Sequence, residues 1–100
     1  MAKRKITWTE KANLERIEIL EYWINRNKSK TYSVKLNQLI KTSLKQVAEN
    51  PTIGRKTDFD ENVRLKIVRD YLIFYQYDSA ELKVLSVWSG YRNEKSISIK

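Results

Sequence analysis

Hydrophobic and polar residues alternate at the start of the chain and then change to a helical spacing. Ile6 and Trp8 alternate with polar residues, which predicts a short strand over Lys5–Trp8. Thr9 follows as the expected N-cap of a helix, because its hydroxyl can accept a hydrogen bond from a free N–H group of the first turn. We expect this helix to end near residues 25–27. Its apolar stripe, at spacings of three and four, comprises Leu14, Ile17, Leu20, Trp23 and Ile24.

A second amphipathic helix is predicted after a short polar link. Ser29 or Thr31 is the expected N-cap, and Asn50 followed by Pro51 is the expected end, because proline disfavours a helical conformation in the residue before it. Two helices joined by so short a link form an antiparallel hairpin. The apolar stripe of the second helix comprises Tyr32, Leu36, Leu39, Ile40, Leu44 and Val47.

The second half of the chain has the pattern of strands. Residues 52–62 contain Gly54 and several charges, so we expect a loop there. Alternation predicts a strand over residues 63–68, and the continuous apolar and aromatic run Tyr71–Tyr77 is typical of a strand buried on both faces. A turn at residues 78–81 and a last strand at residues 82–88 complete the order: strand, helix, helix, strand, strand, strand.

Composition indicates one small domain over residues 1–100, with a single shared core. The chain of 100 residues is 41% hydrophobic, with only 2 Gly and 1 Pro, which favours a folded core over linkers or disorder. The N-terminus has no apolar segment of the kind found in signal peptides, and no run approaches the roughly 20 apolar residues that span a bilayer. We therefore expect a cytoplasmic protein without membrane contact.

Charge and missing residue types narrow the chemistry. The net charge of +8 creates a field that attracts polyanions or an acidic protein. The sequence has neither cysteine nor histidine, which excludes disulfides, thiol nucleophiles and cysteine-ligated zinc, and removes the usual acid/base residue of neutral pH. The carboxylates have no companions typical of a metal site, so we expect no metal and no cofactor. Any catalysis must use other groups.

Several stretches together are similar to one family of proteins. They are TEKA after the first strand, LERIEILEYWI in the first helix, ENPTIGR, VRLKIVRDYLIFYQY and VLSVWSGYRN. The most specific element is NP-x-x-GR followed by an arginine and a Y-x-I-x-Y strand. With these residues the chain resembles the RelE/ParE superfamily of bacterial type II toxins. The residues of this element are Asn50, Pro51, Gly54, Arg55, Arg64, Tyr71, Ile73 and Tyr75.

The resemblance implies a fold, a partner and two possible activities. The fold is an α+β domain in which the helical hairpin packs on one face of a twisted sheet, and the last three strands form an antiparallel meander. The partner is a cognate antitoxin that wraps over the helices and the sheet. The activity is either ribosome-dependent cleavage of messenger RNA or, in the ParE branch, inhibition of DNA gyrase.

If the chain is an enzyme, we expect a metal-independent endonuclease. Such an enzyme must assist attack by the 2′ hydroxyl, stabilise the charge of the phosphorane and protonate the leaving oxygen, which lysine, arginine and tyrosine can do. The central strand lacks the arginine that messenger-RNA-cutting relatives often carry, and SGYRN is closer to ParE-like endings, which favours gyrase. The candidate catalytic residues are Arg55, Arg64, Lys66, Tyr91 and Arg92, and the candidate target-binding residues are Arg55, Arg64, Lys66, Arg69 and Arg92.

Plainer interpretations remain open for the same residues. Arg64 and Lys66 can solvate an exposed strand face, and the arginines of the loops can form surface ion pairs. We expect Lys66 and Arg69 at the rim of an open sheet face, and Phe74 in the core. The alternative function is a non-catalytic RNA-binding module, in which the basic sheet holds phosphates. An acidic, amphipathic partner peptide on the helical hairpin would distinguish a toxin from such a module.

Overall fold

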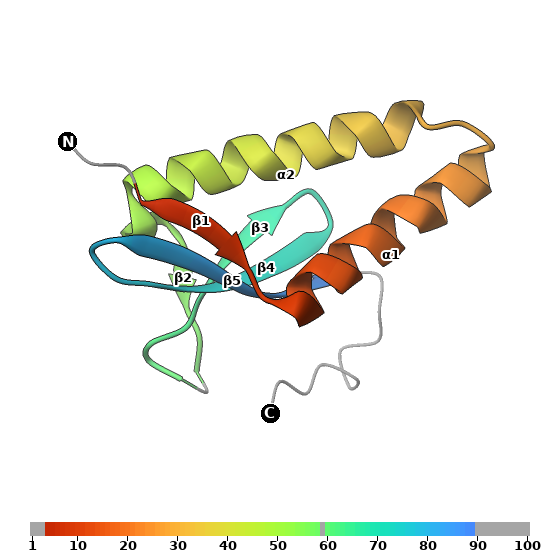
Figure 1. Cartoon of the computed structure of the whole chain (residues 1–100). Helices are drawn as coiled ribbons and strands as arrows, with labels where there is room; N and C mark the ends of the chain where they lie inside the picture. Colours follow the sequence, from red (N-terminus) through yellow and green to blue (C-terminus); the bar gives the residue numbers. More distant parts are fainter. Residues whose placement is uncertain (1–3, 59, 90–100) are drawn as a thin grey trace.

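The structure is a computed structural model that describes residues 4–58 and 60–89. Figure 1 shows a helical hairpin lying on one side of a twisted sheet. The elements in chain order are β1 (Lys5–Trp8), α1 (Glu10–Asn27), α2 (Thr31–Glu49), the 3₁₀ turn η1 (Pro51–Ile53), β2 (Arg55–Lys56), β3 (Arg64–Val68), β4 (Tyr71–Tyr77) and β5 (Glu81–Ser89).

The sheet is mixed, and its five strands have the order β1-β5-β4-β3-β2. The first strand β1 runs parallel to β5, whereas all other neighbours are antiparallel. The predicted α+β class, the helical hairpin and the antiparallel meander of β3, β4 and β5 are confirmed. The prediction of a plain loop over residues 52–62 is wrong, because η1 extends into this segment and β2 lies within it. A strand of two residues is too short to show any periodicity.

The helix ends follow capping chemistry in part. Thr9 is the N-cap of α1 as predicted, and its side chain accepts a hydrogen bond from the N–H of Ala12 at 3.0 Å. The predicted N-cap of α2 is wrong, because Lys30 occupies that position without a side-chain hydrogen bond. Ser29 accepts a hydrogen bond from the N–H of Thr31 instead, at 3.2 Å. Lys28 ends α1 in the left-handed conformation that closes many helices.

The main core lies between the hairpin and the sheet. The stripe of α2 is confirmed, with Leu36, Ile40, Leu44 and Val47 at most 1% exposed. They pack against alternate residues of β4 and β5, among them Ile73 and Tyr75 of β4, which are fully buried. The side chains of Leu82, Val84 and Val87 complete this layer from β5.

The predicted stripe of α1 is wrong at its start and confirmed further along, where Leu20 and Trp23 pack against the main core. Leu14 and Ile17 are 53% and 38% exposed, and the buried residues of α1 are Ala12 and Ile19 instead. Arg16 lies on the inward side, where its guanidinium stacks over the ring of Trp8 at 4.5 Å and donates a hydrogen bond to Asn37 of α2 at 3.0 Å. A polar residue on the packing face interrupts the apolar pattern, so the pattern alone selects the wrong residues in the first half of the helix.

A second apolar cluster lies on the opposite face of the sheet. Phe74 is 3% exposed and packs with Val63 and Trp88, and Leu65, Leu72 and Leu85 border this cluster. The prediction of a single shared core is therefore wrong, because the sheet carries apolar residues on both faces. The continuous run of β4 reflects this arrangement, since each of its faces meets a different cluster.

Polar side chains of α1 replace a strand along part of the edge of β5. The strand β1 pairs only with residues 81–84 of β5. Beyond that point the carboxylate of Glu15 accepts hydrogen bonds from the N–H of Val87 at 3.0 Å and from the hydroxyl of Ser86 at 2.8 Å. The hydroxyl of Thr9 donates to the carbonyl of Leu85 at 3.1 Å. These contacts fix the start of α1 against the sheet.

Candidate functional site

The NP-x-x-GR element and the end of β4 form one structural unit. The hydroxyl of Tyr75 is buried and donates a hydrogen bond to the carbonyl of Pro51 at 2.6 Å. The ring of Tyr75 lies against Gly54, where a Cβ atom would come within 2.9 Å of the carbonyl oxygen of Leu65. Tyr75 is therefore held in contact with Pro51 and Gly54, which lie far from it in the sequence. This contact explains physically why the glycine accompanies the tyrosine.

Arg64 belongs to the same unit. Its Nη1 donates hydrogen bonds to the carbonyls of Gly54, at 2.7 Å, and Thr52, at 3.2 Å. The guanidinium thus fastens the η1–β2 segment to β3. These contacts give Arg64 a structural role, whereas the sequence suggested only target binding, catalysis or solvation of the strand.

Alanine at Arg64 is therefore expected to destabilise the fold. Hydrogen bonds to charged groups contribute about 1.5–3 kcal/mol, and partial exposure reduces this, so we expect the free energy of unfolding to fall by about 1–2 kcal/mol. Arg55→Ala is the matched control, because Arg55 is exposed in the neighbouring strand. Urea titration followed by circular dichroism measures both. Equal and small losses for the two variants would contradict a structural role for Arg64.

The strand register separates the predicted cations onto two faces. Arg64 and Lys66 pair with Tyr75 and Ile73 of β4, so they share the side of the sheet that carries the helices. The expectation that Lys66 borders the open face is therefore wrong. Arg55 pairs with Leu65, whose side chain points to the other face. The sheet itself keeps Arg55 away from Arg64 and Lys66.

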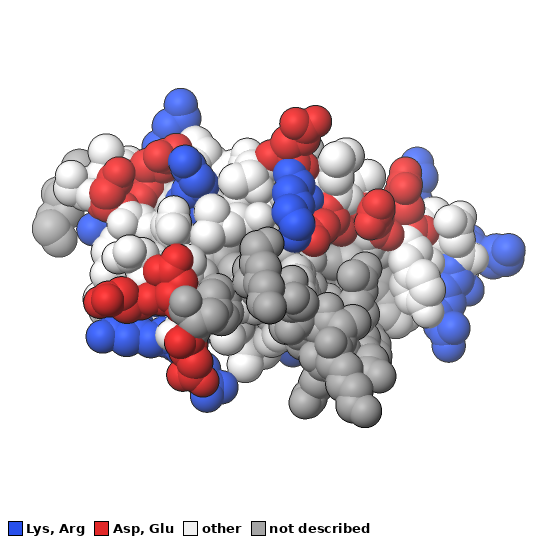
Figure 2. All heavy atoms as spheres, turned by 90° about the horizontal axis from the view of Figure 1, so that it is seen from below, with Lys and Arg blue, Asp and Glu red and all other residues white. Residues whose placement is uncertain are grey.

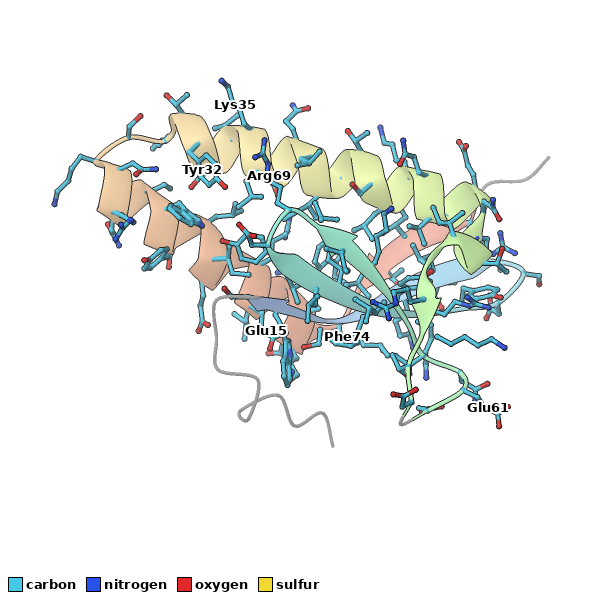
Figure 3. All side chains as sticks on the ribbon, turned by 180° about the vertical axis from the view of Figure 1, so that it is seen from behind. Glu15, Tyr32, Lys35, Glu61, Arg69 and Phe74 are labelled. Carbon is cyan, nitrogen blue, oxygen red and sulfur yellow. The ribbon has the colours of Figure 1, made fainter. Side chains whose placement is uncertain are left out.

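The remaining candidates lie elsewhere. Arg69 is exposed in the turn between β3 and β4, with a positive φ of 55°, and Figure 3 shows it near Lys35 of α2. Tyr91 and Arg92 lie outside the described residues. The structure therefore brings together no three of the predicted catalytic residues among those it describes.

The tyrosines of β4 are poorly suited to act as bases. Burial raises the pKa of both Tyr71 and Tyr75 above the ordinary value of 10.0. The hydroxyl of Tyr71 also accepts a hydrogen bond from the indole N–H of Trp23 at 2.5 Å. At neutral pH both phenols are therefore protonated, and they serve the core as hydrogen-bonding groups. Both residues belong to the main core, with Tyr71 at 3% and Tyr75 at 0% exposure.

Two hollows were not anticipated from the sequence. A mostly apolar one of about 650 Å³ lies beside α1 and is bordered by Glu18, Tyr22, Trp23, Arg26 and Tyr71. A polar one of about 590 Å³ is bordered by Lys56, Glu61, Asn62, Arg64 and Tyr77, at the end of the sheet near β2. Because their residues come from distant parts of the chain, only the clustering of aromatic residues at 22–23 hints at the first hollow in the sequence.

Among residues 4–58 and 60–89, no three carboxylates lie close enough together to bind a metal ion. No helix in the described part of the chain is long and apolar enough to cross a membrane.

The fold and the NP-x-x-GR unit define a small α+β domain of the kind found in toxin–antitoxin proteins. The family model described as ParE toxin of type II toxin-antitoxin system, parDE, matches residues 6–94. The chain therefore belongs to the ParE toxin family, and it is the toxin of a type II system that an antitoxin neutralises. This favours the toxin hypothesis over a plain RNA-binding module.

A solved structure has the same fold. It is described as the chromosomal ParDE TA system from P. aeruginosa, with a TM-score of 0.71 and 16% sequence identity, and the match covers 87% of this chain and 96% of that one. A comparison with curated protein sequences gives no significant match. At 16% sequence identity, this likeness supports the fold alone.

Proposed function

We propose that this toxin stops growth in the cytoplasm by inhibiting DNA gyrase through a binding surface and not by cutting messenger RNA. The observation that carries the proposal is the separation of the cationic candidates. Arg64 is engaged by backbone carbonyls, and Arg55 lies on the opposite face of the sheet. Cleavage without a metal needs a base, an acid and a charge stabiliser around one phosphate. The described residues offer no such convergence.

The proposal is tested by two assays on one purified protein. We expect the chain to inhibit supercoiling of relaxed plasmid by gyrase, and to leave messenger RNA intact in a ribosome-programmed translation mixture. The matched control is the chain mixed with its antitoxin, which should restore supercoiling. Cleavage of messenger RNA with normal supercoiling would overturn the proposal and indicate the RelE-like activity.

The antitoxin surface is also proposed. Three aliphatic side chains of the hairpin are unusually exposed: Leu14 at 53% and Ile17 at 38% on α1, and Val34 at 57% on α2. Exposed apolar residues on adjoining helices fit the apolar face of an amphipathic helix. The charge of +8 attracts an acidic segment and accelerates the encounter. The partner that these features fit is an acidic, amphipathic segment of an antitoxin of the ParD type.

Glutamate at Leu14 and Ile17 together is expected to weaken the complex with the antitoxin. Losing two aliphatic contacts with the antitoxin corresponds to about 2–3 kcal/mol, or a Kd that is roughly 30-fold to 150-fold higher. The control is the double variant Ile53→Glu and Ile67→Glu, which changes two residues of similar exposure away from the hairpin. Isothermal titration calorimetry measures both. An unchanged Kd for the hairpin variant would place the antitoxin elsewhere.

A further inference from the structure

The positive charge of the chain is concentrated in one segment. Residues 22–48 contain six of the 20 lysines and arginines and none of the 12 aspartates and glutamates. This segment therefore supplies six of the eight net charges, although it is about a quarter of the chain. None of the target-binding residues predicted from the sequence belongs to this segment. The excess charge lies mainly in this segment, which Glu21 and Glu49 flank.

The hairpin presents these cations to solvent. All six side chains are exposed, and they occupy the last turn of α1, the link and α2. In α2, Lys41 and Lys45 are separated by one helical turn, and both lie away from the buried stripe of Leu36, Ile40 and Leu44. Arg26, Lys28, Lys30 and Lys35 are the other four.

A seventh cation comes from the sheet. Arg69, in the β3–β4 turn, lies near Lys35, and Figures 1 and 3 both show this turn coming close to α2. Figure 2 views the molecule from the opposite side, where acidic and basic side chains are intermixed. On the side formed by α2 the exposed acids of the described residues are Glu49, at the end of the helix, and Asp70, next to Arg69. We call Lys30, Lys35, Lys41, Lys45 and Arg69 the basic face of α2.

The polar residues between the lysines are of types that bind phosphate. Thr31, Gln38, Thr42 and Gln46 are exposed on α2 and supply hydroxyl and amide donors. Val34 is the one exposed large apolar side chain of α2. Protein interfaces have apolar centres that are depleted of charge, whereas the phosphodiester backbone is bound by lysine, arginine, hydroxyl and amide groups. A helix of 19 residues is about 28 Å long, enough to follow several phosphates.

We propose that the basic face of α2 binds the phosphodiester backbone of double-stranded nucleic acid without reading its sequence. This activity goes beyond the proposed inhibition of gyrase. It requires neither the antitoxin nor the NP-x-x-GR unit, so it can be tested on the purified chain alone.

The test is fluorescence anisotropy with a labelled duplex over a series of salt concentrations. With four or five phosphate contacts, the logarithm of the association constant should fall against the logarithm of salt concentration with a slope of about −4. The double variant Lys41→Gln and Lys45→Gln should reduce the magnitude of this slope by about 2 and weaken binding uniformly across duplex sequences. Glutamine preserves helix propensity, and circular dichroism confirms the fold.

The control is the double variant Lys5→Gln and Lys83→Gln, which removes the same charge from exposed positions of β1 and β5. It should retain the parent slope. Equal losses for both pairs would show a mere effect of net charge and would overturn the proposal. The absence of duplex binding at low salt would also overturn it. So would a Lys41→Gln and Lys45→Gln variant that no longer binds a polyglutamate peptide but still binds the duplex as the parent does. Duplex DNA and duplex RNA serve as separate probes, and the duplex that binds more tightly is the nucleic acid that the basic face of α2 prefers.

Discussion

Replacing Phe74 with alanine is expected to lower the free energy of unfolding by about 3–5 kcal/mol, as removal of a buried aromatic side chain does. The side chain is 3% exposed, and its ring meets that of Trp88 edge to face at a centroid distance of 5.9 Å. Aromatic pairs in this geometry add about 0.5–1.5 kcal/mol to the burial of area. The loss falls on the cluster that faces away from the helices, so it reports on that side of the sheet.

Two control variants isolate this effect. Ile67→Ala changes an aliphatic residue of the same face that is 48% exposed, and it should cost far less than the loss at Phe74. Phe74→Leu keeps most of the volume and should cost about 1–2 kcal/mol. Urea unfolding followed by tryptophan fluorescence and circular dichroism measures all three. If Phe74→Ala unfolds with the midpoint of the parent, the second cluster contributes nothing to stability.

The order of elements could be predicted because most of them are long and regular. The stripe of α2 has buried apolar residues at uninterrupted helical spacing, and β4 has a continuous apolar run. Thr9 could be identified as a cap from its residue type and its position before the helix. In these places local propensity and tertiary burial agree, so a pattern of residues is enough.

The failures have an equally physical cause. The inward side of α1 carries Glu15 and Arg16, whose partners are the backbone of β5 and a side chain of α2. Such partners are distant in the sequence, so the pattern treats both residues as solvent-facing and selects Leu14 and Ile17 in their place. The parallel pairing of β1 with β5 is also a long-range contact, and β2 has only two residues.

The candidate site shows the same limit. That Arg64 and Lys66 share one side of β3 follows from alternation, but which side they share depends on the register with β4. The hydrogen bonds from Arg64 to Thr52 and Gly54 depend on how the η1–β2 segment folds back. Cations of the sheet and of the hairpin thus differ in role. Arg64 of the sheet stabilises the η1–β2 segment, whereas the exposed cations of the hairpin are available to a partner.

Replacing Gly54 with alanine should destabilise the fold by about 2–4 kcal/mol, because overpacking and a lost buried hydrogen bond act together. The dihedral angles of Gly54 are φ −75° and ψ 158°, which any residue adopts. If conformation alone mattered, alanine would stabilise the chain by about 0.4–1 kcal/mol through the unfolded state. The opposite sign is expected because the new Cβ would contact the buried hydroxyl of Tyr75 and the carbonyl of Leu65.

The partner variant Tyr75→Phe separates the two contributions. In the double variant Gly54→Ala and Tyr75→Phe, the new Cβ no longer meets a hydroxyl. Its contacts with the ring of residue 75 and with the carbonyl of Leu65, each at 2.9 Å, remain. The combined loss should therefore be smaller than the sum of the single losses, with a coupling of about 1–2 kcal/mol. Thr52→Ala, at an exposed neighbouring position, is the control. A stabilising Gly54→Ala, or strict additivity with Tyr75→Phe, would mean that the glycine and the tyrosine do not act as one unit.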